Sequence, residues 1–110
     1  MNDLMKMALE ESLELTSSVI SRTYRTKNEL NSIYNKYQED IRTISSLISM
    51  VHDAKNTSGN KSDMVVALEK LMLSKQKDVN ELSKVIELTT ENAIDLEKSK
   101  KWIKTITETP

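Results

Sequence analysis

The single histidine of the chain, His52, is followed directly by Asp53, and this pair is the closest the sequence comes to an acid–base or metal-binding motif. Zinc sites are built from three or four His, Cys or carboxylate ligands. The chain has no cysteine and no second histidine, so the pair lacks the partners that a metal site needs. We expect no metal site, and we expect His52 to lie at the end of a helix, near the negative end of its dipole.

Neighbouring carboxylates such as Glu10 and Glu11, or Glu39 and Asp40, could act as general acids or bases in a concave pocket. No glycine-rich phosphate loop and no nucleophile motif accompanies them. These carboxylates fit the solvated faces of helices. The sequence therefore predicts a protein that is not an enzyme, with no catalytic residue, no cofactor and no small-molecule substrate.

Residues 98–104 form a basic run that contains the one tryptophan, Trp102. Such a run can contact phosphate or an anionic membrane surface. It can also pair with Glu10, Glu11 and Glu14 if the two ends of the chain meet. The chain as a whole has 16 basic and 17 acidic residues. This balance is not typical of a nucleic-acid-binding protein, and we expect no nucleic-acid partner.

The elements that hold these residues are predicted from the scarcity of helix breakers. One glycine, Gly59, and one proline, at the last position, cannot supply the turns that a β-rich fold needs at intervals of roughly 8–12 residues. The only cluster of turn-forming residues is 56–62, where Gly59 suits the end of a helix. Two glycosylation patterns in this cluster, at Asn56 and Asn60, are interpreted as turn residues. We expect one all-α domain, 1–110, with helices at about 3–56 and 63–107 and a turn at 57–62.

Apolar residues recur in both halves at alternating intervals of three and four, which predicts a heptad seam. In the first half the seam comprises Leu9, Leu13, Thr16, Ile20, Thr23, Lys27, Leu30, Tyr34, Tyr37, Ile41, Ile44, Ile48 and Val51. In the second half it comprises Val65, Leu68, Met72, Lys75, Val79, Leu82, Ile86, Thr89, Ala93, Leu96, Lys100 and Ile103.

The two seams match when the chain is folded antiparallel about residue 58. Val51 then meets Val65, and Lys75 lies opposite Ile41, with its stem along the isoleucine and its amine in water. The acidic start of the chain also faces the basic run at 98–104, and such flanking pairs favour this register. We therefore expect a single long antiparallel helical hairpin, weakest where 21–29 meets 89–95.

A second set of apolar residues lies beside the seam, where a lone hairpin would leave many of them in water. Such residues are natural contacts for further helices. The sequence predicts that the hairpin assembles into a helix bundle with another helical chain, as a homo- or hetero-oligomer. The predicted partner interface is Leu15, Val19, Ile33, Leu47, Leu71, Val85, Leu88 and Trp102.

No apolar stretch approaches the roughly 18 residues that span a bilayer, so no membrane span is expected. The first residues, Met1 to Lys6, do not form a Sec signal peptide. We expect a cytoplasmic location, with export independent of a Sec signal as the alternative.

The Cys-free chain, with one long helix–turn–helix, resembles the small helical-hairpin proteins of type VII secretion, the Esx-like proteins and the helical partners of that system's toxins. The family's Trp-Xaa-Gly turn is replaced here by Thr57-Ser58-Gly59-Asn60, and no tyrosine follows Tyr37 to begin the C-terminal export signal. The resemblance implies a partner subunit or targeting chaperone whose export signal lies in another chain.

The shape alone fits other functions equally. A phage or viral structural or assembly subunit, or a cytosolic coiled-coil adaptor, would also be a non-enzymatic helical hairpin. A SNARE-like tether is disfavoured, because nothing in the sequence anchors it to a membrane.

Overall fold

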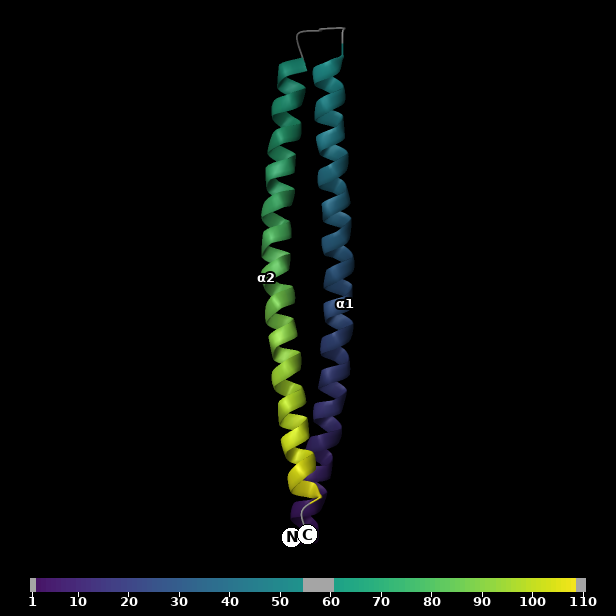
Figure 1. Cartoon of the computed structure of the whole chain (residues 1–110), viewed down its shortest axis with the longest axis vertical. Coiled ribbons are helices and arrows are strands. Elements are labelled where there is room, and N and C mark those ends of the chain that lie inside the picture. Colours follow the sequence, from purple (N-terminus) through teal and green to yellow (C-terminus); the bar gives the residue numbers. More distant parts are fainter. Residues whose placement is uncertain (1, 55–60, 109–110) are drawn as a thin grey trace. The chain divides into compact units, whose positions relative to one another are not determined.

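The computed structural model describes residues 2–54 and 61–108, with side chains described at 2–54 and 63–108, and it contains two long helices. Helix α1 is Asp3–Asp53, with 51 residues, and helix α2 is Lys61–Thr107, with 47 residues (Figure 1). No strand occurs in these described ranges. The predicted all-α helical hairpin is confirmed.

The ends of the helices are closed by local hydrogen bonds. Asn2 caps α1, because its side-chain Oδ1 accepts a hydrogen bond of 2.7 Å from the Met5 amide. At the other end of α1, the Ala54 amide donates to the Val51 carbonyl at 3.3 Å. These bonds satisfy backbone groups that have no partner within the helix.

The connection differs in part from the predicted turn at 57–62. Lys61 and Ser62 belong to the first turn of α2. Helix α1 also ends at Asp53, short of the predicted end at about 56. The other positions of the predicted turn, including Gly59, lie outside the described residues.

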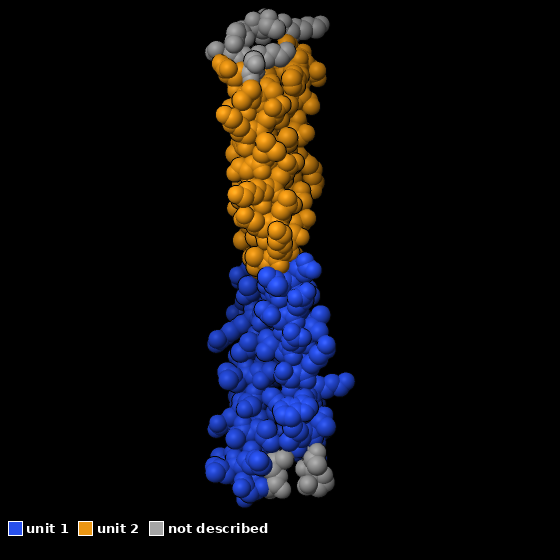
Figure 2. All heavy atoms as spheres, turned by 90° about the vertical axis from the view of Figure 1, so that its left-hand side faces the viewer, with its two compact units in different colours: residues 1–29, 86–110 blue, residues 30–85 orange. Residues whose placement is uncertain are grey.

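The described chain forms two compact units (Figure 2). Unit 1 combines residues 1–29 and 86–110, and unit 2 is residues 30–85. Within each unit a segment of α1 lies beside a segment of α2 (Figure 1).

In both units the seam predicted from the heptads is the core. Every predicted seam residue is buried or half-buried. The fully buried ones are Ile20 and Ala93 in unit 1, and Ile44, Val65 and Val79 in unit 2. The alternating three and four spacing therefore identifies the inward face of both helices.

Two polar seam residues, Thr16 and Thr23, form their hydrogen bonds within α1 and not with α2. The hydroxyls of Thr16 and Thr23 donate to the carbonyls four residues earlier, at 2.7 Å and 2.8 Å. A hydroxyl that is satisfied by its own helix can face the partner helix without an unpaired polar atom.

Lys75, predicted to carry its amine to water, has two partners that the sequence did not predict. Its Nζ lies 3.5 Å from Oδ2 of Asp40 and 4.1 Å from the centre of the Tyr37 ring. Both partners are on α1, within four positions of the predicted neighbour Ile41. The lysine therefore supports the predicted antiparallel register, while its charge is retained at the seam by a carboxylate and an aromatic face.

Candidate interaction surface

The seam divides the outer surface of each unit into two sides. A residue directly before a seam residue lies to one side of the seam, and a residue directly after it lies to the other, because each step turns the helix by about 100°. The two helices run in opposite directions and their seams face each other. For this reason the residues that precede seam residues on α1 lie on the same side of the helix pair as the residues that precede seam residues on α2. We call the side made of preceding residues the leading side, and the side made of following residues the trailing side.

All eight predicted interface residues directly precede a seam residue, so all eight lie on the leading side. Seven of them are exposed, from 42 % for Ile33 and Leu47 to 66 % for Leu15. Val19 is the exception and is half-buried. In unit 1 these residues are Leu15, Val19, Leu88 and Trp102, and in unit 2 they are Ile33, Leu47, Leu71 and Val85.

Two open grooves show that preceding residues of both helices lie on the same side. In unit 1, Val19 and Thr26 of α1 line a groove of about 530 Å³ together with Asn92 and Ser99 of α2. In unit 2, Ile33 of α1 lines a groove of about 470 Å³ with Asp78 and Val85 of α2. Each groove therefore opens on the leading side of its unit.

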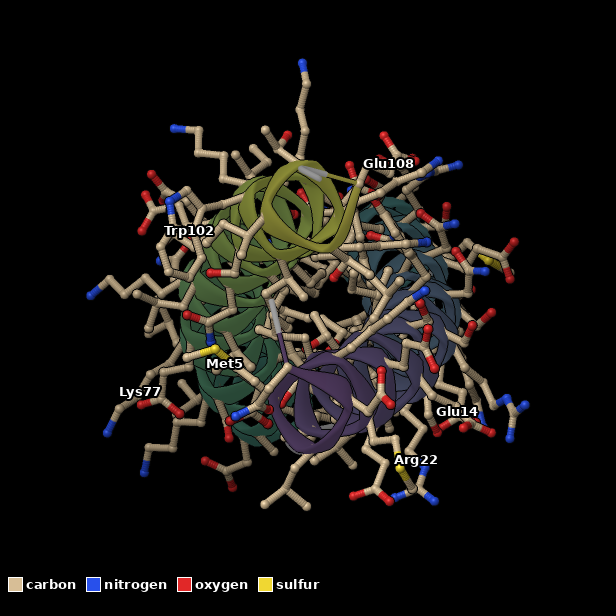
Figure 3. All side chains as sticks on the ribbon, turned by 90° about the horizontal axis from the view of Figure 1, so that it is seen from below. Met5, Glu14, Arg22, Lys77, Trp102 and Glu108 are labelled. Atoms are coloured by element: carbon tan, nitrogen blue, oxygen red, sulfur yellow. The ribbon has the colours of Figure 1, made fainter. Side chains whose placement is uncertain are left out.

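A view along the helices shows the two sides of unit 1 (Figure 3). Met5 and Trp102 point to one side, and Glu14 and Glu108 point to the other. Glu14 directly follows the seam residue Leu13, as expected for the trailing side.

The trailing side is polar next to the seam. The residues directly next to the seam on this side carry no aliphatic side chain. They are the residues that follow Thr16, Thr23, Leu30, Tyr37, Ile44 and Val51 on α1, and Leu68, Lys75, Leu82, Thr89, Leu96 and Ile103 on α2. The exposed apolar residues Val66, Leu73 and Ile94 occur farther out on this side. A second helical layer would therefore find aliphatic contacts next to the seam on the leading side, whereas the trailing side offers the exposed ring of Tyr24 there.

Tyr24 and Glu97 form a hydrogen bond between the helices on the trailing side of unit 1. The tyrosine hydroxyl donates to Oε1 of Glu97 at 2.9 Å. This hydrogen bond, together with partial desolvation and the negative charge of Glu97, raises the pKa of Tyr24 above its ordinary value. The neutral phenol is thus the form that the fold stabilises.

This contact predicts a pH dependence at the alkaline end. Because the folded pKa is raised, the stabilisation by this bond is fully present below the ordinary tyrosine pKa and is lost as the pH rises through the folded pKa. We expect Glu97→Gln to lower the pKa of Tyr24 towards its ordinary value, measured by phenolate absorbance in a background of Tyr34→Phe and Tyr37→Phe. An unchanged midpoint in Glu97→Gln would show that the bond does not form in solution.

An acidic layer interrupts the apolar residues of the leading side in unit 2. Asp40 and Asp78 each lie seven positions from the apolar residues on their own helix, between Ile33 and Leu47 on α1 and between Leu71 and Val85 on α2. Lys75 pairs with Asp40, and Asp78 lines the groove. A partner on this side must therefore accept carboxylate oxygens midway between two apolar contacts.

The sequence-based interface omitted exposed methionines on the same side. Met50 precedes Val51 and is 66 % exposed, and Met5 lies fourteen positions before Val19. Met64 precedes Val65 and is also exposed. Their positions relative to the seam are the signal that identifies them, and flexible thioethers suit a contact surface.

The basic run at 98–104 does not pair with the acidic start of α1 as expected. Lys100, Lys101 and Lys104 form no ion pair with the glutamates at positions 10, 11 and 14 in the described structure. Exposed pairs of this kind gain only about 0–1 kcal/mol, which does not order two long side chains. The four lysines of the run lie at different angles around α2, with Lys100 at the seam, so they do not share one basic face.

His52 and the carboxylates considered as metal or acid–base groups do not form a metal-binding cluster in the described part of the chain. His52 is exposed in the last turn of α1. Among the described residues, no group of three or more His, Cys, Asp or Glu side chains is placed to hold a metal ion. No helix in the described part of the chain is long and apolar enough to cross a membrane.

Comparison of the chain with protein-family models, with curated proteins and with solved structures finds no match.

Proposed function

We propose that the chain is a non-enzymatic interaction protein that binds a partner helical chain through its leading side. The observation that carries this proposal is that the aliphatic side chains directly next to the seam, such as Val19, Ile33 and Leu71, lie on the leading side, while the matching positions on the trailing side carry none.

The thin core supports the need for a partner. Only five apolar side chains are buried among the described residues, two in unit 1 and three in unit 2. Fixing the backbone of each residue costs about 1–2 kcal/mol, and the main compensation is burial of apolar surface. A second helical layer on the leading side would add that burial without changing the seam.

The biological setting that we propose is secretion-associated: a partner subunit or targeting chaperone for another helical chain. The helical-hairpin fold supports this setting, because such a chain can contribute two helices to a bundle with its partner. Recovery of the chain from native cells in a complex with a larger toxin-like protein would support the setting, and closed rings or filaments of this chain alone would argue for a structural subunit.

The binding side is tested by paired charge substitutions. In the double variant Leu71→Glu, Leu88→Glu, the carboxylates occupy the leading side, and we expect the complex isolated from native cells to be lost while far-ultraviolet circular dichroism stays helical. The matched control is Leu73→Glu, Ile94→Glu, which places the same charges on trailing-side residues of comparable exposure. Complex mass is measured by sedimentation, and an intact complex with the Leu71, Leu88 variant would refute the proposal.

A further inference from the structure

We infer that the groove of unit 2 binds one basic side chain of the partner chain, an arginine that the partner carries midway between two apolar residues. This inference rests on the proposed function and names the chemistry that the partner must present at this site. All the residues that carry it lie in unit 2, residues 30–85.

The groove of unit 2 combines an apolar lining with two carboxylates. Its volume is about 470 Å³, and its lining residues are Ile33, Tyr37, Asp78, Glu81, Leu82 and Val85. Four of these side chains are aliphatic or aromatic and two are acidic, and none of the described residues that line the groove is basic. An occupant that complements the groove therefore brings apolar surface and a positive charge to the same place.

The two carboxylates of the groove have no cation of their own. In the described part of the chain neither Asp78 nor Glu81 forms an ion pair. Asp78 is half-buried, so its charge is partly withdrawn from water without compensation. A cation supplied by a partner would provide that compensation.

The spacing of the two carboxylates favours arginine over lysine as the source of this cation. Asp78 and Glu81 are three positions apart on α2, which places their Cβ atoms about 5–6 Å apart on one face of the helix. A guanidinium group is planar and carries five N–H donors in a fixed fork, so one arginine can donate to both carboxylates. The ammonium group of lysine is a more strongly hydrated point charge and loses more when it leaves water.

The apolar lining suits the stem of an arginine side chain. Ile33 and Val85 are 42 % and 45 % exposed, and they line the groove together with the seam residue Leu82. The methylene groups of arginine pack along apolar surface of this kind while its charged head stays at polar groups. The ring of Tyr37 also lines the groove, and aromatic rings attract cations.

Unit 2 already holds one of its own cations in this manner. The Nζ of Lys75 lies 3.5 Å from Oδ2 of Asp40 and 4.1 Å from the centre of the Tyr37 ring. A carboxylate and an aromatic ring thus hold a basic group beside the groove. This pair occupies Asp40, the α1 carboxylate of the acidic layer, and leaves Asp78, the α2 carboxylate, for a cation of the partner.

The neighbours of Asp78 along α2 set the pattern that the partner must carry. Leu71 and Val85 lie seven positions before and after Asp78, or about 10.5 Å away on each side along the helix. A helical segment that packs along α2 with its arginine at Asp78 brings the residues seven positions from that arginine to Leu71 and Val85. Those two residues of the partner should therefore be apolar.

Synthetic helical peptides test this inference with a defined partner. Each peptide is built from alanine and glutamine, carries leucine seven positions before and seven positions after its central residue, and has arginine, glutamine or glutamate at the centre. We expect the wild-type chain to bind the arginine peptide about tenfold or more tightly than the glutamate peptide, with the glutamine peptide between them. Fluorescence anisotropy of the labelled peptides measures the affinities, and the preference should shrink at high ionic strength.

Two groove variants assign this preference to the carboxylates. Asp78→Asn with Glu81→Gln keeps the shape of both side chains and should abolish the preference. Asp78→Lys with Glu81→Lys should reverse it in favour of the glutamate peptide. The matched control is Glu39→Gln with Glu69→Gln, which removes two exposed carboxylates of unit 2 outside the groove and should leave the preference unchanged.

The outcomes separate this inference from the proposed function. An arginine peptide that does not bind, or that binds no more tightly than the glutamine peptide, would overturn the inference. A preference retained in the Asp78→Asn, Glu81→Gln variant would also overturn it, and so would free arginine amide that binds as tightly as the arginine peptide, since that would indicate a small-molecule site. In each case the Leu71, Leu88 double variant still decides independently whether the leading side binds another helical chain.

Discussion

Substitution of Ile44 by aspartate is expected to unfold unit 2. Ile44 is only 6 % exposed at the seam, so a carboxylate at its position would be withdrawn from water. Burial of an unpaired charged group in place of a core isoleucine costs roughly 3 kcal/mol or more, which is a large fraction of the stability of a small domain. Far-ultraviolet circular dichroism during thermal unfolding measures the loss.

The matched control lies one helical turn away. Leu47→Asp introduces the same side chain on the same helix, but at a leading-side position that is 42 % exposed. We expect this variant to remain helical and to lose association, so the two aspartates separate folding at the seam from binding at the leading side. If Ile44→Asp and Leu47→Asp reduced helix content equally, the distinction between seam and leading side would be wrong.

Substitutions in the groove of unit 1 should change association through the leading side in opposite directions according to their polarity. Thr26 and Asn92 are both exposed and line this groove. We expect Thr26→Asp with Asn92→Asp to weaken the complex at least tenfold, or about 1.4 kcal/mol, because a partner that covers the groove must remove the new charges from water. Thr26→Val with Asn92→Leu should strengthen it.

The direction of each effect is the informative quantity. Both double variants remove the same native side chains, so a loss of native contacts would weaken the complex in both, whereas burial of the groove weakens one and strengthens the other. Sedimentation velocity of the complex isolated from native cells measures both effects. Equal weakening by the two variants would contradict burial of this groove by a partner.

The seam was predictable from the sequence because its period is a property of the helix. Positions such as Ile20, Ile44 and Val79 alternate at intervals of three and four, and only the inward face of a paired helix requires this pattern. The structure buries or half-buries every seam position. Long helices with few breakers make the fold class equally direct to predict.

The interface residues were predictable as a set, but their common side was not recognised. They were identified by their position beside the seam, and only the rule that preceding residues share one side places Leu15 and Trp102 with Val19 and Ile33. The grooves in the two units then show that the rule holds for both helices. The same rule adds Met50, which the sequence-based selection omitted.

Side-chain electrostatics was the least predictable part. The register of the hairpin is compatible with pairing between 98–104 and the acidic start of α1, yet those pairs do not form in the described structure, while Lys75 forms an ion pair with Asp40 that was not predicted. The difference is burial. Lys75 and Asp40 are each partly withdrawn from solvent, with side-chain exposures of 27 % and 38 %, so their attraction is less screened than that of fully solvated lysines.

The layer expected to be weakest is closely packed at one point. Ala93, within the segment 89–95, is the most buried core residue at 1 % exposure. An alanine is covered to this extent only where the two helices come close together, and its neighbour Asn92 lines the groove of unit 1. The sequence showed that few large apolar side chains lie at the seam in this layer. It did not show at which residue the two helices come closest.

Sedimentation equilibrium of the complex isolated from native cells tests most directly whether a helical chain covers the leading side. We expect the wild-type chain to sediment with a mass well above the chain mass of 12.6 kDa. The Leu71→Glu, Leu88→Glu variant should remain at the mass of one chain. A wild-type mass of 12.6 kDa would contradict the proposed interaction.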